Sequence, residues 1–213
     1  MPAVDFLTAG FFVPTTMIGG MNMSTFVGVD PGFQGSIAIL SGCKQPQIFD
    51  IPIKIEKKGK RIKRSYDLEA LRDIFKKIYK IDKNAIVGIE NVSVRFGEGS
   101  VSAFNFGKGI GQLQMAIVML GFEMSLIAPQ TWKKSFPELV TDEMLKIKEQ
   151  AKKAIGKAKT TLNRKYKELA KTEARFLAQK LYPGIEEMFV RKKDDGRAES
   201  LLIAVHLKMG KNL

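Results

Sequence analysis

The stretch that most constrains this fold is residues 26–40, where two apolar runs are separated by a short turn rich in Gly and Pro. This pattern is typical of a β-hairpin. Asp30 closes the first run, at a place where a buried strand normally keeps its side chains neutral. A buried aspartate is almost always paired or bound to a metal, although a turn aspartate before Pro-Gly often caps only its own backbone. Carboxylates further along the chain decide between these interpretations.

The net charge of the chain indicates what kind of molecule it binds. The 213 residues carry 35 Lys and Arg against 22 Asp and Glu, which gives a formal net charge of +13. Such an excess is the electrostatic footprint of a nucleic-acid-binding protein. A membrane-surface protein can share this charge, but the sequence shows no basic amphipathic helix with an aromatic apolar face. The length suits one domain, which we place at residues 23–213.

The rare residue types and the N-terminus indicate the compartment. The single cysteine, Cys43, excludes an internal disulfide and fits a reducing compartment, and the single histidine leaves no room for a zinc site of His and Cys ligands. No basic residue precedes the apolar residues 6–20, so a secretory signal is not expected, and this stretch is too short to span a membrane. We therefore interpret residues 1–22 as a disordered or non-native extension. The protein is expected in the cytoplasm or in an organellar or viral DNA compartment, and not to be secreted.

A dense group of cations follows the hairpin. Residues 47–55 read as a third strand, which runs into seven Lys and Arg within residues 54–64 and turns at Gly59. Crowding these charges together without an anionic partner is costly. A solvated hairpin tip is one interpretation, and contact with phosphates is the favoured one. The seven cations are Lys54, Lys57, Lys58, Lys60, Arg61, Lys63 and Arg64.

A second carboxylate closes a second buried strand. Asp67 and the apolar spacing after it predict a helix over residues 68–78, and residues 84–90 form an apolar strand that ends in Glu90. A crossover helix between two apolar runs implies parallel strands at the sheet centre. Because active sites in such sheets lie at the carboxyl ends of strands, we expect Asp30 and Glu90 at the same edge of the sheet.

The next segment carries glycines without a phosphate-binding pattern. Residues 91–102 are predicted to form a polar loop that contains Arg95 and Phe96, and residues 104–120 a long helix. The glycines at the start of this helix match neither the phosphate-loop nor the dinucleotide template. Close packing of the helix on the sheet explains them better.

The C-terminal half is predicted to be largely helical. A strand over residues 123–128 leads into a helix that begins at Pro129, in which Trp132 is interpreted as a core anchor rather than a base-stacking platform. Residues 141–171 form a basic helical insertion, with ten Lys or Arg against four acids, and are expected to face solvent or DNA. Residues 174–181 form a further amphipathic helix.

The last predicted helix carries two acids on one face. Asp195 and Glu199 are four residues apart, a spacing at which like charges repel unless a cation lies between them. An acidic first turn favoured by the helix dipole explains Asp195 well and Glu199 poorly. Asp194 lies well round the helix and suits an N-cap better. His206 is roughly 10 Å further along the same face, which indicates a packing residue.

Together these carboxylates predict a site with oxygen ligands only, which favours Mg²⁺ or Mn²⁺. Two such ions about 3.5–4 Å apart are able to activate water and stabilise the leaving oxygen of a phosphodiester. The residues alone therefore indicate a metal-dependent nuclease whose basic shell binds DNA. The candidate DNA-binding residues are Lys57, Lys58, Lys60, Arg61, Lys63, Arg64, Arg95, Phe96, Lys108, Lys133, Lys192 and Lys193.

Four motifs in order resemble those of the RuvC-type Holliday-junction resolvases, above all their phage-borne and chloroplast relatives in the RNase H-like superfamily. They are the hairpin with Val-Asp-Pro-Gly, the strand ending Ile-Glu, the segment Pro-x-x-Trp-Lys, and the terminal Asp-Asp-Gly-Arg-Ala-Glu-Ser-Leu-Leu-Ile-Ala. The resemblance covers about residues 24–206. It implies an α/β RNase H-like fold, in which a central mixed five-stranded sheet is flanked by helices.

The resemblance also implies a site and a substrate. Asp30, Glu90, Asp195 and Glu199 would be the catalytic residues and the ligands of two Mg²⁺ ions, with Mn²⁺ able to substitute, and the substrate would be a four-way or related branched DNA junction. Bacterial resolvases usually place two aspartates three apart on the last helix. Here the spacing is four and the final acid is Glu, so the choice between Asp194 and Asp195 stays open.

The resemblance further implies a homodimer that makes paired incisions. The helix after Glu90 is the expected interface, through an apolar face with Leu113, Ile117 and Leu120, although core packing explains that face equally well. Phe96 is expected to pry apart base pairs at the crossover.

Two other functions are compatible with parts of the sequence. Actin-like ATPases and sugar kinases share the fold and an Asp-bearing hairpin, but they need two such domains and this chain has one. A non-catalytic DNA-binding protein explains the charge but gives no reason for converging carboxylates.

Overall fold

The computed structural model describes residues 24–42, 44–59, 61–93 and 99–210. The predictions for residues 1–22, Cys43, Lys60, Arg95 and Phe96 lie outside these ranges. No helix in the described part of the chain is long and apolar enough to cross a membrane.

A mixed five-stranded sheet forms the centre of the molecule, as predicted. Its order is β3-β2-β1-β6-β7. β2 pairs antiparallel with both β1 and β3, whereas β6 pairs parallel with both β1 and β7. The parallel pairing of β1 with β6 confirms what the apolar runs and the crossover helix indicated. The strands are β1 (Thr25–Asp30), β2 (Ser36–Ser41), β3 (Gln47–Asp50), β6 (Ile86–Glu90) and β7 (Glu123–Ile127).

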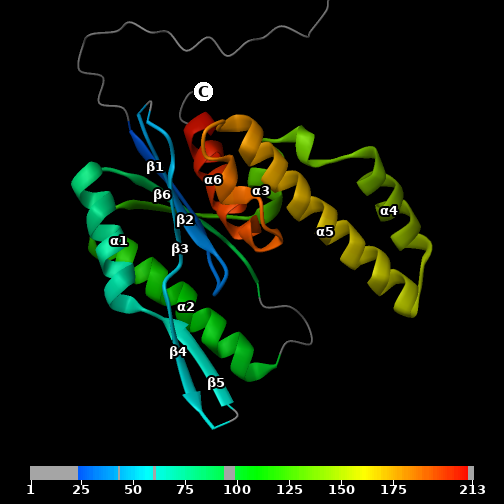
Figure 1. Cartoon of the computed structure of the whole chain (residues 1–213), viewed down its shortest axis with the longest axis horizontal. Coiled ribbons are helices and arrows are strands. Elements are labelled where there is room, and N and C mark those ends of the chain that lie inside the picture. The colour runs from blue at the N-terminus through cyan, green and yellow to red at the C-terminus, as the bar shows by residue number, and fades with distance from the viewer. Residues whose placement is uncertain (1–23, 43, 60, 94–98, 211–213) are drawn as a thin grey trace, which may run out of the picture.

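Helices cover both faces of this sheet (Figure 1). Val27 and Val29 of β1 pack with α1 (Leu68–Ile81) and α2 (Ser100–Met119), while Phe26 packs on the opposite face. That face is covered by α6 (Asp195–Gly210) and by the end of α5 (Gly156–Leu181). A sheet buried on both faces explains why its strands read as continuous apolar runs.

The packing of α6 on β1 is unusually close. A Cβ atom at Gly28 would lie only 2.0 Å from the carbonyl oxygen of Ser200. Only glycine therefore fits at this strand position, and its absence of a side chain lets the helix axis approach the strand. This approach brings the first turns of α6 next to the carboxyl end of β1.

The predicted strand over residues 47–55 is interrupted, which corrects the expectation of one continuous strand. β3 ends at Asp50, and a separate strand, β4 (Ile53–Lys58), pairs antiparallel with β5 (Arg61–Tyr66). Pro52 lies at the break and has no N–H to continue a ladder. The two strands form a hairpin that projects from the body of the molecule (Figure 1).

Two helix boundaries also differ from expectation. α2 begins at Ser100, so the last residues of the predicted loop 91–102 are helical. The predicted helix over 174–181 is the end of one continuous helix, α5, because nothing in residues 172–175 interrupts the helical backbone. A short helix, α3 (Pro129–Lys133), and a 3₁₀ turn, Pro137–Leu139, connect β7 to the basic segment.

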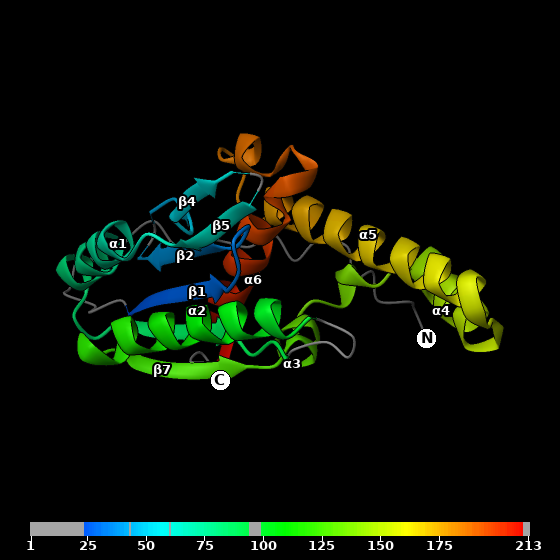
Figure 2. The same ribbon diagram turned by 90° about the horizontal axis from the view of Figure 1, so that it is seen from below.

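The basic segment forms an arm. α4 (Asp142–Lys153) packs along α5 through the buried residues Met144, Ile147 and Ala151. The two helices extend side by side away from the sheet (Figure 2). We call residues 142–171 the arm. After α5, two 3₁₀ turns, Glu186–Phe189 and Lys192–Asp194, lead into α6.

Candidate active site

Asp30 and Glu90 lie side by side at the edge of the sheet, as predicted. The register of the parallel pair sets Val29 opposite Ile89, so the next residue of each strand is a carboxylate. Glu90 is buried and Asp30 is partly buried. The chain reverses directly after Asp30, and the amide of Gly32 donates a hydrogen bond to the hydroxyl of Tyr66 at 3.1 Å.

The last helix brings a third carboxylate to the same place. Carboxylate oxygens of Asp30, Glu90 and Glu199 all lie within 4.8 Å of one another. Gly196, in the first turn of α6, makes this convergence possible, since a Cβ there would lie 2.9 Å from Oδ2 of Asp30 and 2.4 Å from the carbonyl oxygen of Gln34. The carboxylate of Asp30 thus points at the start of α6.

Buried hydroxyls fix the start of α6 against the first hairpin. The hydroxyl of Ser36, on β2, donates to the carbonyl of Gly196 at 3.0 Å, and the hydroxyls of Ser36 and Ser200 are 2.6 Å apart. All of these atoms are buried, where an unmade hydrogen bond is costly. The turn that carries Asp30 and the helix that carries Glu199 are therefore held as one unit.

The electrostatics of this cluster are unfavourable in the protein alone. Burial raises the pKa of Asp30 well above its usual value, and the neighbouring charges of Glu199, Glu90 and Asp195 raise it further. Burial also raises the pKa of Glu199, against the opposing charge of Lys133. Converging carboxylates with raised pKa values are typical of functional sites.

A tryptophan and a lysine orient two of the ligands from outside. The indole Nε1 of Trp132 donates to Oε1 of Glu90 at 2.9 Å, and Nζ of Lys133 lies 3.6 Å from Oε1 of Glu199. Trp132 is fully buried, so the prediction of a core anchor is confirmed, but its hydrogen bond also holds a site carboxylate. The Lys133 ammonium lies over the Trp132 ring at 4.8 Å from the centroid.

Asp195 reaches the same cleft with its charge already paired. Its Oδ2 accepts a hydrogen bond from the ammonium of Lys171, on α5. Burial opposes the charge of Lys171, but the hydrogen bond that it donates to Asp195 and the negative charge of Asp195 raise the pKa of this lysine overall. Asp195 lines one cleft, of about 700 Å³, with Asp30, Glu90 and Glu199, which we call the acidic cleft. Its carboxylate is not within the 4.8 Å group that the other three form.

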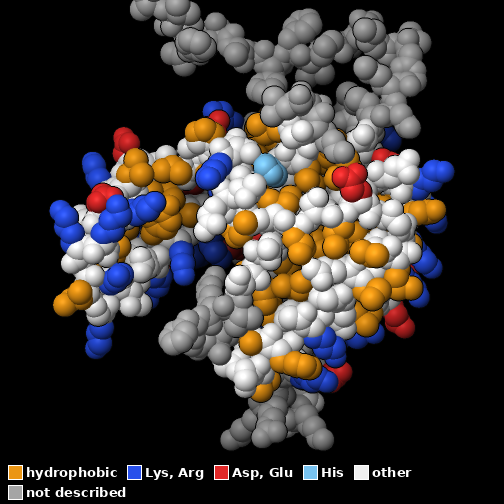
Figure 3. Space-filling view, turned by 180° about the vertical axis from the view of Figure 1, so that it is seen from behind, with side chains coloured by type: hydrophobic (Ala, Val, Ile, Leu, Met, Phe, Trp, Pro, Cys, Tyr) orange, Lys and Arg blue, Asp and Glu red, His pale blue; other side chains and the backbone are white. Residues whose placement is uncertain are grey.

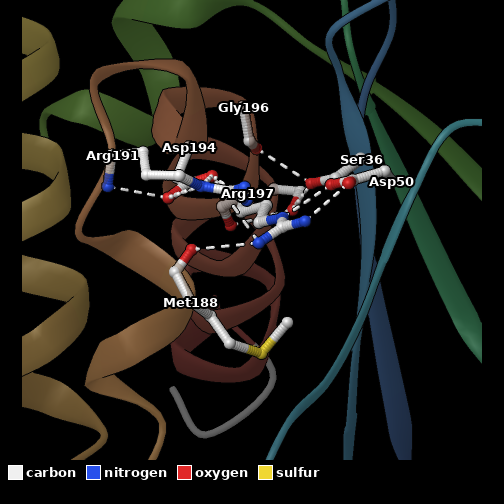
Figure 4. Close-up of polar contacts among 8 residues, drawn as sticks. Ser36, Asp50, Met188, Arg191, Asp194, Gly196 and Arg197 are labelled. Carbon is white, nitrogen blue, oxygen red and sulfur yellow. Dashed lines mark hydrogen bonds and ion pairs between the residues drawn. The ribbon is translucent and has the colours of Figure 1, made fainter.

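The carboxylate of Asp194 contacts Arg191 and Arg197 (Figure 4). Asp194 is buried, yet its carboxylate accepts the backbone N–H of Arg191 at 2.8 Å and two guanidinium nitrogens of the same residue. Burial works against the charge, but the hydrogen bonds from Arg191 lower the pKa of Asp194 overall. Arg197, 3.6 Å from Asp194, also pairs with Asp50. Asp194 directly precedes α6, as an N-cap would, but its side chain bonds back to Arg191.

Among the described residues, the possible metal ligands that converge here are all carboxylate oxygens. Three carboxylates from two strand ends and one helix suit a hard divalent cation such as Mg²⁺ or Mn²⁺ and do not suit a softer metal. A cation there would also offset the repulsion that raises the pKa of Asp30. His206, which was expected to be too distant, contacts Ser135 instead, with its Nδ1 2.7 Å from the hydroxyl.

Two of the candidate DNA-binding residues line this cleft, and five others are exposed on the protein surface. Arg64 and Lys133 line it, and Lys57, Lys63, Lys108, Lys192 and Lys193 are exposed. The side chains of Lys58 and Arg61 lie outside what the structure describes. Lys and Arg side chains gather on the arm and toward the hollow between the arm and the body (Figure 3). The arm adds Lys167 and Tyr166 to the cleft lining.

Sequence reasoning missed Lys171, the contact between Trp132 and Glu90, and Tyr66. Lys171 was one basic residue among ten in a helical segment, and nothing local marks it as the one that points to the site. The segment Pro-x-x-Trp-Lys was the available signal for Trp132. Tyr66 ends β5, the second strand of the hairpin that was expected to turn at Gly59, but nothing in the sequence indicates its contact with the Asp30 turn.

Comparisons with known proteins give a limited result. No family model matches this sequence, and no curated protein matches it. Among solved structures, the chain is similar to RuvC of Thermus thermophilus in complex with a Holliday junction substrate, with 11% identity over 88% of this chain and 96% of that chain and a TM-score of 0.47. It is also similar to a second structure of Thermus thermophilus RuvC, with 14% identity over 87% of this chain and 96% of that chain and a TM-score of 0.41.

Proposed function

We propose that this protein is a metal-dependent endonuclease that cuts phosphodiester bonds in branched DNA. The observation that carries the proposal is the approach of Asp30, Glu90 and Glu199 to within 4.8 Å in a cleft bordered by cations. The three carboxylates are suited to binding a divalent metal, and the cations at the border of the cleft are suited to binding a polyanionic substrate. A non-catalytic DNA-binding protein would carry the cost of this acidic cluster without a use for it.

Each residue of the cleft has a role in this chemistry. Asp30, Glu90 and Glu199 would hold the divalent ions, with Asp195 as a further ligand once Lys171 turns to a phosphate. Bound Mg²⁺ would supply a nucleophilic hydroxide and stabilise the leaving oxygen of an in-line displacement. Trp132 keeps the Glu90 carboxylate in orientation, and Lys133 borders the place where a scissile phosphate would lie.

The molecule offers cations on two sides of the cleft. The β4–β5 hairpin lies on one side with Lys57, Lys63 and Arg64, and the arm lies on the other with Lys167 and Lys171. A duplex arm of DNA contacts proteins mainly through its phosphates. Two separated basic elements suit a substrate with more than one duplex arm. Together with the four motifs that resemble the RuvC-type resolvases, this favours a four-way junction.

We further propose a homodimer, through a different face of α2 from the one expected. Leu113 and Ile117 are fully buried against the sheet, so they belong to the core and are unavailable to a partner. The opposite face of α2 exposes an apolar stripe, and among the described residues no atom lies within 4 Å of a Cβ built at Gly107 or Gly111. The exposed apolar residues are Val101, Phe104, Met115, Val118 and Met119. A second copy on this stripe would give two active sites related by two-fold symmetry, which matches a two-fold junction.

The proposal is tested by incubating the protein with an end-labelled four-way junction with and without Mg²⁺. We expect paired incisions only with the metal, and no cleavage of the matching linear duplex. ATP hydrolysis without DNA cleavage would instead support the actin-like ATPase alternative. Tight junction binding without cleavage in Mg²⁺ or Mn²⁺ would support a purely DNA-binding role.

A further inference from the structure

A second cleft, of about 780 Å³, adjoins the acidic cleft and is not used by the chemistry above. It lies between β5 of the projecting hairpin and the first turns of α2. Gly32, Phe33, Arg64 and Phe106 line both clefts, so the two are continuous at that border. We call the second one the aromatic cleft.

Three aromatic side chains form its walls. Phe33, Tyr66 and Phe106 all line it, and the rings of Phe33 and Tyr66 meet edge to face with centroids 5.7 Å apart. Ile62 and Val101 also line it and are 59% and 73% exposed. The cleft is therefore an apolar surface that remains open to solvent, which is costly unless a ligand covers it.

The Tyr66 wall is rigid. Its hydroxyl accepts the Gly32 amide, burial raises its pKa to about 12, and it is therefore neutral at physiological pH. A Cβ at Gly109 would lie 3.0 Å from the Tyr66 ring, so this glycine of α2 gives the ring its place. The wall that faces the cleft is thus fixed by contacts to both the Asp30 turn and α2.

The rim of the cleft is basic and its interior holds one amide. Lys63 and Arg64 lie on the rim, and Asn105 offers both a donor and an acceptor. Lys63 pairs with Glu56 at 3.6 Å, whereas Arg64 has no ion-pair partner in the described part of the chain. Aromatic walls with a cationic rim are the chemistry that binds unpaired nucleotides, because bases stack on the rings and phosphates meet the cations.

We propose that the aromatic cleft receives the unstacked base of a nucleotide next to the scissile phosphate. The inference rests on the proposed function in that the substrate is DNA. Arg64 lines both clefts and would bind a phosphate of the DNA strand at their border. The scissile phosphate would then lie at the metals in the acidic cleft, and the base of the neighbouring nucleotide would lie against Phe106 in the aromatic cleft. Withdrawing that base from the stack costs least at a junction, where base pairs are already disrupted. The cleft would thus favour branched over linear DNA.

The test asks whether the contribution of one DNA base to junction affinity depends on the Phe106 side chain. The cut position is first mapped with wild-type protein in Mg²⁺. Binding is then measured in Ca²⁺ for the intact junction and for junctions in which one nucleotide near the cut is abasic. We expect wild-type protein to lose about 5- to 150-fold in affinity at one abasic position. Phe106→Ala should bind both junctions equally, since it has already lost the stacking partner.

Two further variants keep the result interpretable. Phe106→Leu retains apolar volume without an aromatic face and should also show no loss at the abasic position, so a folding defect in Phe106→Ala does not decide the outcome. Phe176→Ala removes an exposed aromatic on α5 and should respond like wild type. If the abasic position lowers junction affinity equally in wild type and in both Phe106 variants, the proposed binding of a base in the aromatic cleft is wrong.

This failure is separable from failure of the nuclease. If the protein cleaves the junction but no abasic position causes a loss of affinity that depends on Phe106, the proposed role of the aromatic cleft is wrong and the proposed nuclease activity stands. If a scan of abasic positions finds one at which the loss of affinity depends on Phe106, but no divalent metal supports cleavage, the aromatic cleft binds a base and the proposed nuclease activity is wrong.

Discussion

Asp194 and Asp30 are two acids with little exposure to solvent, and their surroundings shift their pKa values in opposite directions. Asp194 has arginine and a backbone amide around it, so its pKa is lowered and its charge belongs to the fold. Asp30 has other carboxylates around it, so its pKa is raised and its charge works against the fold. Both are buried or nearly so, and burial alone does not separate them. The neighbouring residues do separate them, and from these neighbours we infer a structural role for Asp194 and propose a functional one for Asp30.

The largest expected effect is on cleavage. Asp30→Asn or Glu90→Gln removes one ligand charge from the metals, and we expect junction cleavage to fall by at least about a hundredfold. Junction affinity should stay close to wild type, because the Lys and Arg contacts remain. Single-turnover cleavage and a gel-shift titration measure the two. Asp194→Asn, compared on protein that is still folded, should cut at near the wild-type rate.

The next effect is on stability and belongs to Asp194. Asp194→Asn removes the charge and replaces one of the two oxygens that accept from Arg191 with an NH2 group, which cannot accept, and it should lower the free energy of unfolding by about 1–3 kcal/mol. The pKa of Asp194 is lower in the folded state, so its contribution is present above the ordinary carboxyl range and is lost as the pH falls through its folded value. Urea unfolding at neutral and acidic pH measures this. Equal stability of wild type and variant at neutral pH would contradict the structural role.

Asp30→Asn should have the opposite sign in metal-free protein. Because the folded state raises the pKa of Asp30, ionisation costs stability once the pH exceeds the unfolded value. Removing this charge should therefore raise Tm near neutral pH, by about 2–4 °C for each kcal/mol relieved. The increase should shrink as the pH falls and Asp30 is protonated in both states. A lower Tm for the variant in metal-free buffer would show that Asp30 has a stabilising partner.

The smallest effect concerns the basic hairpin. Lys57→Ala and Arg64→Ala should each lower the slope of log K against log salt by roughly 0.9 if each side chain contacts a phosphate. Lys80→Ala, on the exposed side of α1, is the matched control and should leave the slope unchanged. Equal slopes for all four proteins would mean that the hairpin faces solvent.

The sequence was sufficient to predict features that depend on the local pattern of residues, such as the ends of strands and the faces of helices. The end of an apolar strand is visible in the chain, so Asp30 and Glu90 were found, and the parallel register then placed them together. Helical spacing favoured Asp195 over Asp194 for the face that carries Glu199 but left the choice open, and the structure gives Asp194 arginine partners of its own.

Features that depend on contacts between distant elements were beyond the sequence. Lys171 meets Asp195 only because α5 crosses α6, and Trp132 meets Glu90 across 42 positions. The sequence left open whether the α2 face with Leu113 and Ile117 packs in the core or against a partner, because only the position of the sheet decides that it is buried. The hairpin that turns at Gly59 was expected, but its separation from β3 and the extent of β5 were not, because charged residues mask the strand pattern.

The central claim is that Asp30, Glu90 and Glu199 bind divalent metal, and calorimetric titration of metal-free protein with Mn²⁺ tests it most directly. Wild type and Asp194→Asn should bind Mn²⁺ with the same stoichiometry and affinity. Asp30→Asn and Glu90→Gln should lose that binding while remaining folded by circular dichroism. Unchanged Mn²⁺ binding in both of these variants, or its loss in folded Asp194→Asn alone, would contradict the account.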